Sequence, residues 1–204
     1  MSTENSITYP LMEHFYTIQG EGANTGKAAY FLRLGGCDVG CVWCDVKESW
    51  DAGKHSLVTI GAMVDFVKQS GAKRVVITGG EPAMYDLSPL TDALHQLGLE
   101  CYIETSGAYP LSGEWDWICV SPKKFKTPLD EVLKVADELK VIVYNESDLR
   151  WAEQHRLKVK ATCLLFLQPE YSVFNKVSPL IVDYAMKSPE WTISLQTHKI
   201  LQIP

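Results

Sequence analysis

Short apolar runs alternate with longer amphipathic segments along most of the chain. Some runs, such as Val75–Ile77 and Leu164–Leu167, are almost continuously apolar. Such runs are typical of strands in a sheet that is covered by helices on both faces. The predicted strands are Ala29–Leu34, Arg74–Thr78, Glu100–Thr105, Trp115–Val120, Leu139–Val143, Cys163–Leu167 and Trp191–Leu195.

Helical signals lie between these runs. Ser88 and Pro89 predict a helix start with proline at the first helical position, and Gly98 predicts its end. Between them, apolar residues from Leu90 to Leu97 recur at helical spacing. Further helices are predicted from Ile60 to Gly71, after Pro128, after Ser147 and, by a second Ser-Pro pair, from Ser178–Pro179.

The alternation of strands and helices with short connections predicts βαβ units and a parallel sheet. A complete eight-fold (β/α) barrel usually takes ~250 residues, whereas this chain has 204. We therefore predict an α/β fold, an incomplete (β/α) barrel of mainly parallel strands, in a single domain over residues 1–204. Such folds carry their chemistry at the carboxyl ends of the strands, so polar residues just after strands are the functional candidates.

Composition and charge exclude several classes of function. Hydrophobic residues make up 46% of the chain and charged residues 22%, which is too apolar for a disordered protein. The 19 Lys and Arg against 25 Asp and Glu give a net charge of −6. Bulk electrostatic binding to nucleic acid or to an acidic membrane is therefore not expected, although a local basic pocket for a small anion is compatible with this balance.

The expected location of the protein changes how its cysteines are interpreted. No apolar run approaches the ~20 residues needed to span a bilayer, and the polar segment Met1–Asn5 does not resemble the start of a signal peptide. We therefore expect a cytoplasmic protein. In reducing cytosol its 6 cysteines are expected to be metal ligands, catalytic thiols or core residues rather than disulfides.

Three of the cysteines lie in a glycine-containing loop directly after the first predicted strand. Cys37, Cys41 and Cys44 have the spacing C-x3-C-x2-C, and the nearest histidine after them is His55. Structural zinc normally takes four protein ligands, whereas a [4Fe–4S] cluster held by three thiolates keeps one iron open. The cluster is favoured over a Cys3His zinc site with His55 or over buried thiols. The other cysteines, inside apolar strands, are predicted core residues: Cys101, Cys119 and Cys163.

The cysteine loop resembles the signature of the radical S-adenosylmethionine superfamily, C-x3-C-x-aromatic-C, with Trp43 in the aromatic position. In that superfamily the open iron of a [4Fe–4S] cluster binds the amino and carboxylate groups of S-adenosylmethionine. An electron from the cluster then cleaves the sulfonium to a 5′-deoxyadenosyl radical. The resemblance implies a cluster loop over residues 35–46, with Cys37, Cys41 and Cys44 as the metal ligands.

Segments after later strands resemble the superfamily's contacts to S-adenosylmethionine. Gly80 and Glu81 lie where the superfamily grips the methionyl amino group, and Glu81 either joins that grip or braces the turn. Ser121–Lys123 and Gln168–Tyr171 are either ribose and carboxylate contacts or simple proline turns. The implied cofactor-binding residues are Trp43, Asp45, Gly80, Glu81, Ser121, Pro122, Lys123, Gln168, Pro169, Glu170 and Tyr171.

Motifs spread over the whole chain narrow the resemblance from the superfamily to one family within it. T-x-Q-G-E-G at Thr17–Gly22, E-T-S-G at Glu104–Gly107 and Q-T-H-K at Gln196–Lys199 have the same order as in the 7-carboxy-7-deazaguanine synthases. The resemblance implies a lyase that converts 6-carboxy-5,6,7,8-tetrahydropterin to 7-carboxy-7-deazaguanine with loss of ammonia. This reaction belongs to the biosynthesis of queuosine, a modified base of tRNA. The radical is carried by the cofactor, so no catalytic side chain is implied.

The same resemblance implies a set of substrate contacts. Arg33 suits the substrate carboxylate, and Gln19 and Glu21 suit the aminopyrimidinone edge. Taken alone, Arg33 pairing with a surface acid and a structural His198 are the simpler interpretations. The implied substrate-binding residues are Ile18, Gln19, Gly20, Glu21, Arg33, Thr78, His198 and Pro204, the last through a terminal carboxylate.

One position departs from the family pattern. Relatives typically carry Thr or Ser two residues after the third cysteine, and its hydroxyl helps to bind Mg²⁺ beside the substrate. Here that residue is Val46, which offers no oxygen to a cation that requires oxygen ligands. We therefore predict a weaker dependence on Mg²⁺ than in relatives with threonine.

The resemblance also implies partners, and two other functions stay open. A flavodoxin- or ferredoxin-type electron donor and a homodimer are implied. The first alternative is an activating enzyme that makes a glycyl radical on a partner protein, which needs an open site and has no need of Arg33. The second is a non-enzymatic zinc or iron–sulfur module.

Overall fold

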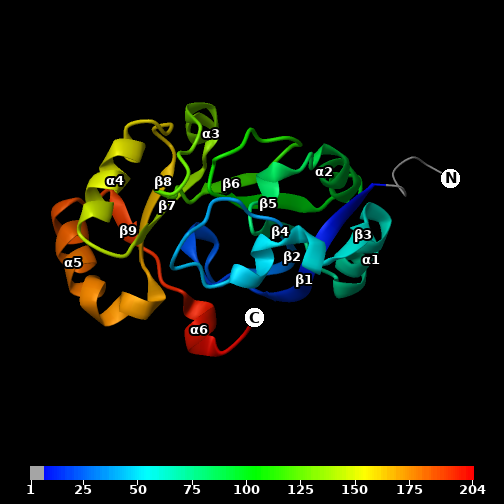
Figure 1. Ribbon diagram of the computed structural model, residues 1–204, viewed down its shortest axis with the longest axis horizontal. Coiled ribbons are helices and arrows are strands. Elements are labelled where there is room, and N and C mark those ends of the chain that lie inside the picture. Colours follow the sequence, from blue (N-terminus) through cyan, green and yellow to red (C-terminus); the bar gives the residue numbers. More distant parts are fainter. Residues whose placement is uncertain (1–6) are drawn as a thin grey trace.

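The fold is built on one curved sheet of nine strands, seen in the computed structural model of the chain (Figure 1). The structure describes residues 7–204, so the segment Met1–Asn5 lies outside the described residues. The strand order is β3-β1-β2-β4-β5-β6-β7-β8-β9. The strands are β1 Thr8–Ile18, β2 Ala28–Leu34, β3 Ser56–Thr59, β4 Arg74–Gly79, β5 Glu100–Thr105, β6 Trp117–Val120, β7 Glu138–Val143, β8 Leu164–Pro169 and β9 Trp191–Ile193.

The pairing within this sheet is mainly parallel. β1 runs antiparallel to β2 and β3, and every other neighbouring pair from β2 to β9 is parallel. β3 and β9 form the two edges, so the sheet of the described residues does not close on itself. The predicted α/β class and the incomplete barrel of mainly parallel strands are confirmed.

Helices surround the sheet, with α1 to α5 at the periphery of the molecule (Figure 1). The predicted end of α1 is confirmed, because Gly71 terminates it with a φ of 70° that favours glycine. The α-helices are α1 Ile60–Ser70, α2 Ser88–His95, α3 Asp130–Val135, α4 Ser147–Arg156, α5 Phe174–Lys187 and α6 Thr197–Leu201. Short 3₁₀ helices are η2 Gly22–Asn24, η3 Lys47–Trp50, η4 Ala52–Lys54, η5 Pro82–Met84 and η6 Tyr171–Val173.

The predicted start of α5 is wrong. The helix begins at Phe174, so Ser178 lies inside it and Pro179 follows. The Ser178 hydroxyl donates to the Phe174 carbonyl at 2.6 Å, one turn back, and does not cap the helix. Burial of Val177 and Ile181 draws the first turn of α5 onto β8, because that turn carries part of the apolar face.

The two faces of the sheet are covered differently. Val75 and Ile77 point outward into the core shared with the helices, whereas Val76 points inward and packs with Phe31 from β2 and Phe15 from β1. The inner cluster consists of strand residues, so the expectation of helices on both faces is wrong. A continuously apolar strand arises here because the sheet curves onto itself. Within residues 7–204, no helix combines the length and apolar character needed to cross a membrane.

Candidate functional site

A cavity of about 270 Å³ opens at the carboxyl ends of the parallel strands. This is the edge at which the sequence predicts chemistry. All but two of the predicted site residues line this cavity, and the two exceptions are Glu81 and Pro122. The predicted residues brought together are Ile18, Gln19, Gly20, Glu21, Arg33, Cys37, Cys41, Trp43, Cys44, Asp45, Thr78, Gly80, Ser121, Lys123, Gln168, Pro169, Glu170, Tyr171, His198 and Pro204.

The cysteine loop leaves β2 through a tightly held turn. Gly36 has a φ of 101°, which favours glycine, and its amide donates to the Ser49 carbonyl at 2.6 Å. The Cys37 amide donates to the Trp50 carbonyl at 3.1 Å. The start of the loop is therefore fixed to η3, and the three cysteines face one cavity.

The spacing of the loop sulfurs argues against a single zinc ion. Tetrahedral zinc with Zn–S bonds near 2.3 Å places its sulfurs about 3.8 Å apart. Within residues 7–204, the only three side chains whose ligand atoms all lie within 4.8 Å of one another are His95, Cys101 and Asp116, at the opposite end of the strands. The three loop sulfurs are therefore not all gathered at the spacing of a single zinc site.

Two further observations bear on the choice of metal centre. His55, the proposed fourth zinc ligand, does not line the cavity, and its Nε2 lies 2.9 Å from the Glu48 carbonyl oxygen. Burial raises the pKa of the Cys41 thiol to about 11, so a bound metal is needed to replace its proton at neutral pH. The three cysteine thiols that face this cavity therefore fit a cluster held by three thiolates.

The end of β4 passes directly against the cysteine loop. A Cβ on Gly80 would overlap the Gly36 carbonyl oxygen and lie 2.7 Å from the Cys37 Cβ. The Gly80 amide donates to the Leu34 carbonyl at 3.0 Å, which ties the two strand ends together. Only a glycine permits this approach, and it leaves bare backbone beside the cysteines for a ligand to contact.

Glu81 lies behind this backbone rather than on the cavity wall. Its side chain is buried and accepts hydrogen bonds from the Thr105 hydroxyl at 2.5 Å, the Ser106 amide at 2.8 Å and the Ala83 amide at 3.1 Å. The Ser106 hydroxyl also donates to it. These contacts support the bracing role for Glu81, because its carboxylate already holds β4 and β5 together.

Polar side chains at and after the ends of β6 and β8 form a further part of the cavity wall. Lys123 donates from Nζ to the Ser121 hydroxyl at 2.5 Å, and its Nζ lies 5.6 Å from the centre of the Trp43 ring. Glu170 caps η6 by accepting from the Ser172 amide at 3.1 Å. Gln168 accepts from the Ser194 hydroxyl at 2.7 Å. This wall therefore offers amide, hydroxyl and ammonium groups to a polar cofactor.

The cavity floor holds two carboxylates on either side of one ammonium group. Lys140 of β7 has only 3% of its side chain exposed, and its Nζ lies 2.6 Å from a Glu21 oxygen and 3.3 Å from a Glu104 oxygen. Gln196 donates to the second Glu21 oxygen at 2.8 Å, and Gln19 donates to the second Glu104 oxygen at 2.7 Å. All five side chains line the cavity.

The charge states of Glu21 and Lys140 are set by their ion pair rather than by burial. Burial alone raises the pKa of Glu21, but the Lys140 ammonium and hydrogen bonds from Lys140, Gln196 and Gln168 outweigh it and lower this pKa to about 2. The two carboxylates likewise hold the pKa of Lys140 well above its usual value despite burial. Glu21 and Lys140 are therefore both ionised at neutral pH.

Arg33 reaches the cavity from β2, and one edge of its guanidinium group is already paired with an acid. Its Nε lies 2.6 Å from a Glu13 oxygen on β1. Its two terminal nitrogens make no hydrogen bond within residues 7–204. Arg33 therefore pairs with an acid, as the simpler interpretation predicts, and the paired donors of its outer edge have no hydrogen-bond partner among residues 7–204.

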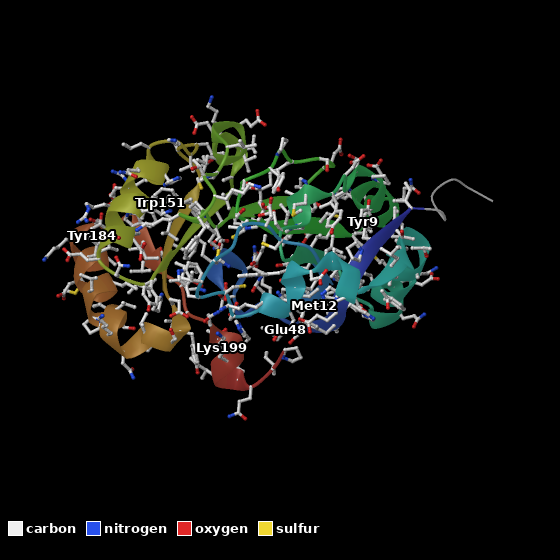
Figure 2. The ribbon with its side chains drawn as sticks, viewed as in Figure 1. Tyr9, Met12, Glu48, Trp151, Tyr184 and Lys199 are labelled. Carbon is white, nitrogen blue, oxygen red and sulfur yellow. The ribbon has the colours of Figure 1, made fainter. Side chains whose placement is uncertain are left out.

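The last helix closes the cavity from the side of the cysteine loop. The Thr197 amide donates to the Gly20 carbonyl at 2.9 Å, and Lys199, labelled in Figure 2, lies 3.3 Å from an Asp45 oxygen. Burial lowers the pKa of His198, so its ring is neutral at pH 7. These contacts hold α6 and Pro204 beside the residues that the sequence predicts to bind a substrate.

Known proteins resemble the chain over nearly its whole length. The sequence model of the Radical SAM superfamily matches residues 32–120. A 7-carboxy-7-deazaguanine synthase from Flavobacterium psychrophilum is 52% identical over 204 residues, which cover 100% of this chain and 97% of that protein. Synthases of the same name from Synechocystis and Escherichia coli are 44% and 35% identical; the matches cover 97% of this chain, and 95% and 100% of those proteins. The chain belongs to the 7-carboxy-7-deazaguanine synthase family.

Comparison with a solved structure supports the assignment to the synthase family. The crystal structure of QueE from Escherichia coli has a TM-score of 0.85 to this chain at 32% identity, covering 95% of this chain and 96% of that chain. Family membership makes the protein an enzyme of the radical S-adenosylmethionine class. That class uses a [4Fe–4S] cluster and S-adenosylmethionine, acts with an electron donor and, in this family, takes a small-molecule substrate.

The sequence alone did not assign a role to three residues of the synthase cavity: Glu104, Lys140 and Gln196. Lys140 offered a signal, because it is a charged residue inside the apolar strand Leu139–Val143. Glu104 and Gln196 are parts of quoted motifs without an assigned contact. Their partners lie far away along the chain, so only the folded structure joins them.

Proposed function

We propose that this chain converts 6-carboxy-5,6,7,8-tetrahydropterin to 7-carboxy-7-deazaguanine with loss of ammonia. The observation that carries the proposal is that two groups of residues line one cavity. Three loop cysteines and the bare backbone of Gly80 form the group named here the cysteine end, and the ionised pair Glu21 and Lys140 with Arg33 forms the group named the ionised end. A cofactor and a polar bicyclic substrate can therefore meet within one cavity.

The cysteine end is proposed to hold the cofactors. Cys37, Cys41 and Cys44 of the loop 35–46 would bind the [4Fe–4S] cluster. When bound, the cluster and S-adenosylmethionine supply a carbon-centred radical that removes hydrogen from the substrate. The Gly80 backbone would receive the methionyl amino group, with Glu81 bracing it. The further proposed cofactor contacts are Trp43, Asp45, Ser121, Pro122, Lys123, Gln168, Pro169, Glu170 and Tyr171.

The ionised end is proposed to hold the pterin. The outer edge of Arg33 would bind its carboxylate with two parallel hydrogen bonds. Gln19, Glu21 and the backbone of Ile18 and Gly20 would accept and donate along the aminopyrimidinone edge. Thr78, His198 and Pro204 would complete the site between the two ligands, with neutral His198 able to donate or accept one hydrogen bond.

The remaining walls keep the reacting atoms apart from other hydrogen donors. Phe15, Phe31 and Trp50 line the cavity with apolar rings. α6 is fixed across its side by the bonds of Thr197 to Gly20. The task of this chain is therefore to position two ligands and to exclude water, since the cofactor supplies the reactive group.

The dependence on Mg²⁺ is proposed to be weaker than in threonine-bearing relatives. Val46 lines the cavity and has no oxygen in its side chain. We expect Val46→Thr to tighten Mg²⁺ binding, measured as the Mg²⁺ concentration for half-maximal turnover. Chelation of Mg²⁺ should leave much of the wild-type turnover intact. Complete collapse of wild-type turnover on chelation would overturn this part of the proposal.

A flavodoxin- or ferredoxin-type donor, a homodimer and a single domain over residues 1–204 belong to the same proposal. The direct test is anaerobic reconstitution with iron and sulfide, followed by incubation with the carboxypterin, S-adenosylmethionine and a reductant. We expect 7-carboxy-7-deazaguanine by mass spectrometry, with many turnovers per S-adenosylmethionine. A protein that binds four irons but leaves the pterin unchanged would refute the proposed reaction.

Arg33→Ala is the matched variant for the substrate end. It should raise KM for the pterin by about 10- to 100-fold, as expected from loss of a charge-assisted pair. Iron content should be unchanged. Arg74→Ala, which removes a surface pair of Arg74 with Glu100, is the control and should leave KM unaltered.

A further inference from the structure

The charged pattern of β7 is unusual for a strand inside a barrel. Its outward residues Leu139, Val141 and Val143 are apolar and buried, whereas Glu138 and Lys140 alternate with them and face inward. Buried lysines are rare unless they are paired. Lys140 contributes its ammonium group to the cavity floor and nothing to the apolar core.

A buried ion pair is weak evidence that its charges are kept for stability. Replacing a buried ion pair by apolar residues of similar volume is often neutral or stabilising, because two charges no longer have to be desolvated. A charged group kept at the floor of a binding cavity therefore points to recognition of a ligand. The feature of the ligand that this ammonium group helps to recognise follows from its two carboxylate neighbours.

The two carboxylates beside Lys140 keep free acceptor sites. An ionised carboxylate has about four lone-pair sites. Glu21 accepts from Lys140, Gln196 and Gln168, and Glu104 accepts from Lys140 and Gln19, so each carboxylate keeps at least one of these sites free. Both carboxylates line the cavity. Together they form a double acceptor that faces the ligand.

We propose that Lys140 is a positioning residue that holds Glu21 and Glu104 as paired acceptors, and that this pair selects ring edges with N–H donors over edges with a carbonyl in the same place. The inference rests on the proposed function. It predicts preference for a 2-amino-4-oxo pteridine over the 2,4-dioxo ring, whose 2-oxo group would meet a carboxylate oxygen.

Removal of the ammonium group should weaken this selection in a pH-dependent way. Burial then raises the pKa of Glu21, and a protonated carboxyl donates a hydrogen bond that a 2-oxo group can accept. The other titratable groups around Lys140 are Glu138 of β7, Cys119 of β6, Lys123 after β6 and His198 of α6. They are present in wild type and variant alike, so the difference between the two reports on position 140.

The experiment measures equilibrium binding of 6-carboxypterin and 6-carboxylumazine to the cluster-loaded enzyme by their fluorescence, between pH 5.5 and 8.5. For wild type we expect a preference for the pterin. Lys140→Met should reduce that preference by about 10- to 100-fold, with the reduction growing as pH falls. Lys140→Arg should restore most of it, because the charge is kept. Lys158→Met, which removes a surface pair with Asp130, should behave as wild type.

A second variant keeps the test decisive if Lys140→Met does not fold. Glu104→Gln retains the shape of the side chain and replaces one acceptor oxygen by a donor, so it should lower the preference for the pterin to a similar degree. Unchanged preference in the folded variants would overturn the role of Lys140. If wild type itself makes no product from the carboxypterin, the proposed function fails instead, so the two failures are distinguishable.

Discussion

The two faces of one sheet differ in what they contribute to the protein. On the outer face, Ile77 and Leu139 are completely buried against the helices, and alternate residues of β7 are apolar. On the inner face, Glu104 and Lys140 bring charges into the barrel. The outer face therefore supplies hydrophobic stability, and the inner face gives up part of that burial to form a site.

The cysteines show the same division. Cys41 is buried and lies in a glycine-containing loop that lines the cavity. Cys163 lies in the core shared by the sheet and the helices. The same residue type is proposed to be a metal ligand at one place and is a small apolar residue at the other, because the surroundings differ.

The strongest test of this comparison replaces one cysteine in the cavity loop and one in the core with alanine. Cys41→Ala should abolish cluster binding and activity, because two thiolates do not hold a [4Fe–4S] cluster. Cys163→Ala should keep full iron content and turnover, with stability lowered by about 1 kcal/mol. Iron analysis, visible absorbance and chemical denaturation give the three readings. Iron loss in Cys163→Ala, or its retention in Cys41→Ala, would contradict the division.

A large change on the outer face should affect stability alone. Leu133 of α3 is completely buried in the outer core. Leu133→Ala should lower the free energy of unfolding by about 2–5 kcal/mol. The folded fraction should bind pterin with wild-type affinity, as measured by fluorescence titration. A weaker affinity per folded molecule would show that the two faces are coupled.

Two glycines sharpen the comparison further. A Cβ on Gly80 would collide with the cysteine loop, whereas a Cβ on Gly71 meets no atom within 4 Å. Gly80→Ala should reduce turnover by about 10- to 100-fold through displacement of the loop. Gly71→Ala should leave turnover unchanged and cost about 1 kcal/mol of stability, since its φ of 70° is unfavourable for alanine. Equal turnover in the two variants would exclude a special role for Gly80.

The smallest expected effect concerns His155, a buried histidine of helix α4. Burial lowers the pKa of His155 below its usual value of 6.5, so the unfolded chain takes up a proton that the folded chain resists. Stability should therefore decline as pH falls through 6.5 and below. His155→Gln should make this decline shallower between pH 7 and 5.5 without altering pterin affinity. Denaturation curves at both pH values test it, and an unchanged slope would show that another group is responsible.

The sequence allowed the parallel strands to be predicted better than the antiparallel ones. β4 and β8 are marked by continuous apolar runs, because both of their faces are covered. β1 was not predicted as a strand, since Pro10 and the polar pair Glu13 and His14 interrupt its pattern. Pro10 is tolerated because β1 pairs with the short edge strand β3 through few residues.

The candidate site was predictable wherever a motif follows a strand. The cysteine loop and Gly80 are of this kind, because local sequence determines both the turn and the chemistry. Lys140 was not assigned, since its partner Glu21 lies 119 residues away along the chain. Only the folded, curved sheet brings the two together, and a lysine in an apolar strand was the one available signal.

The measurement that tests the central claim most directly is electron paramagnetic resonance of the reduced, cluster-loaded protein. S-adenosylmethionine labelled with ¹⁵N in its amino group and ¹⁷O in its carboxylate provides the probe. We predict hyperfine coupling from both labels, because Cys37, Cys41 and Cys44 leave one iron open. Absence of coupling, together with a fourth protein ligand on the cluster, would contradict the account.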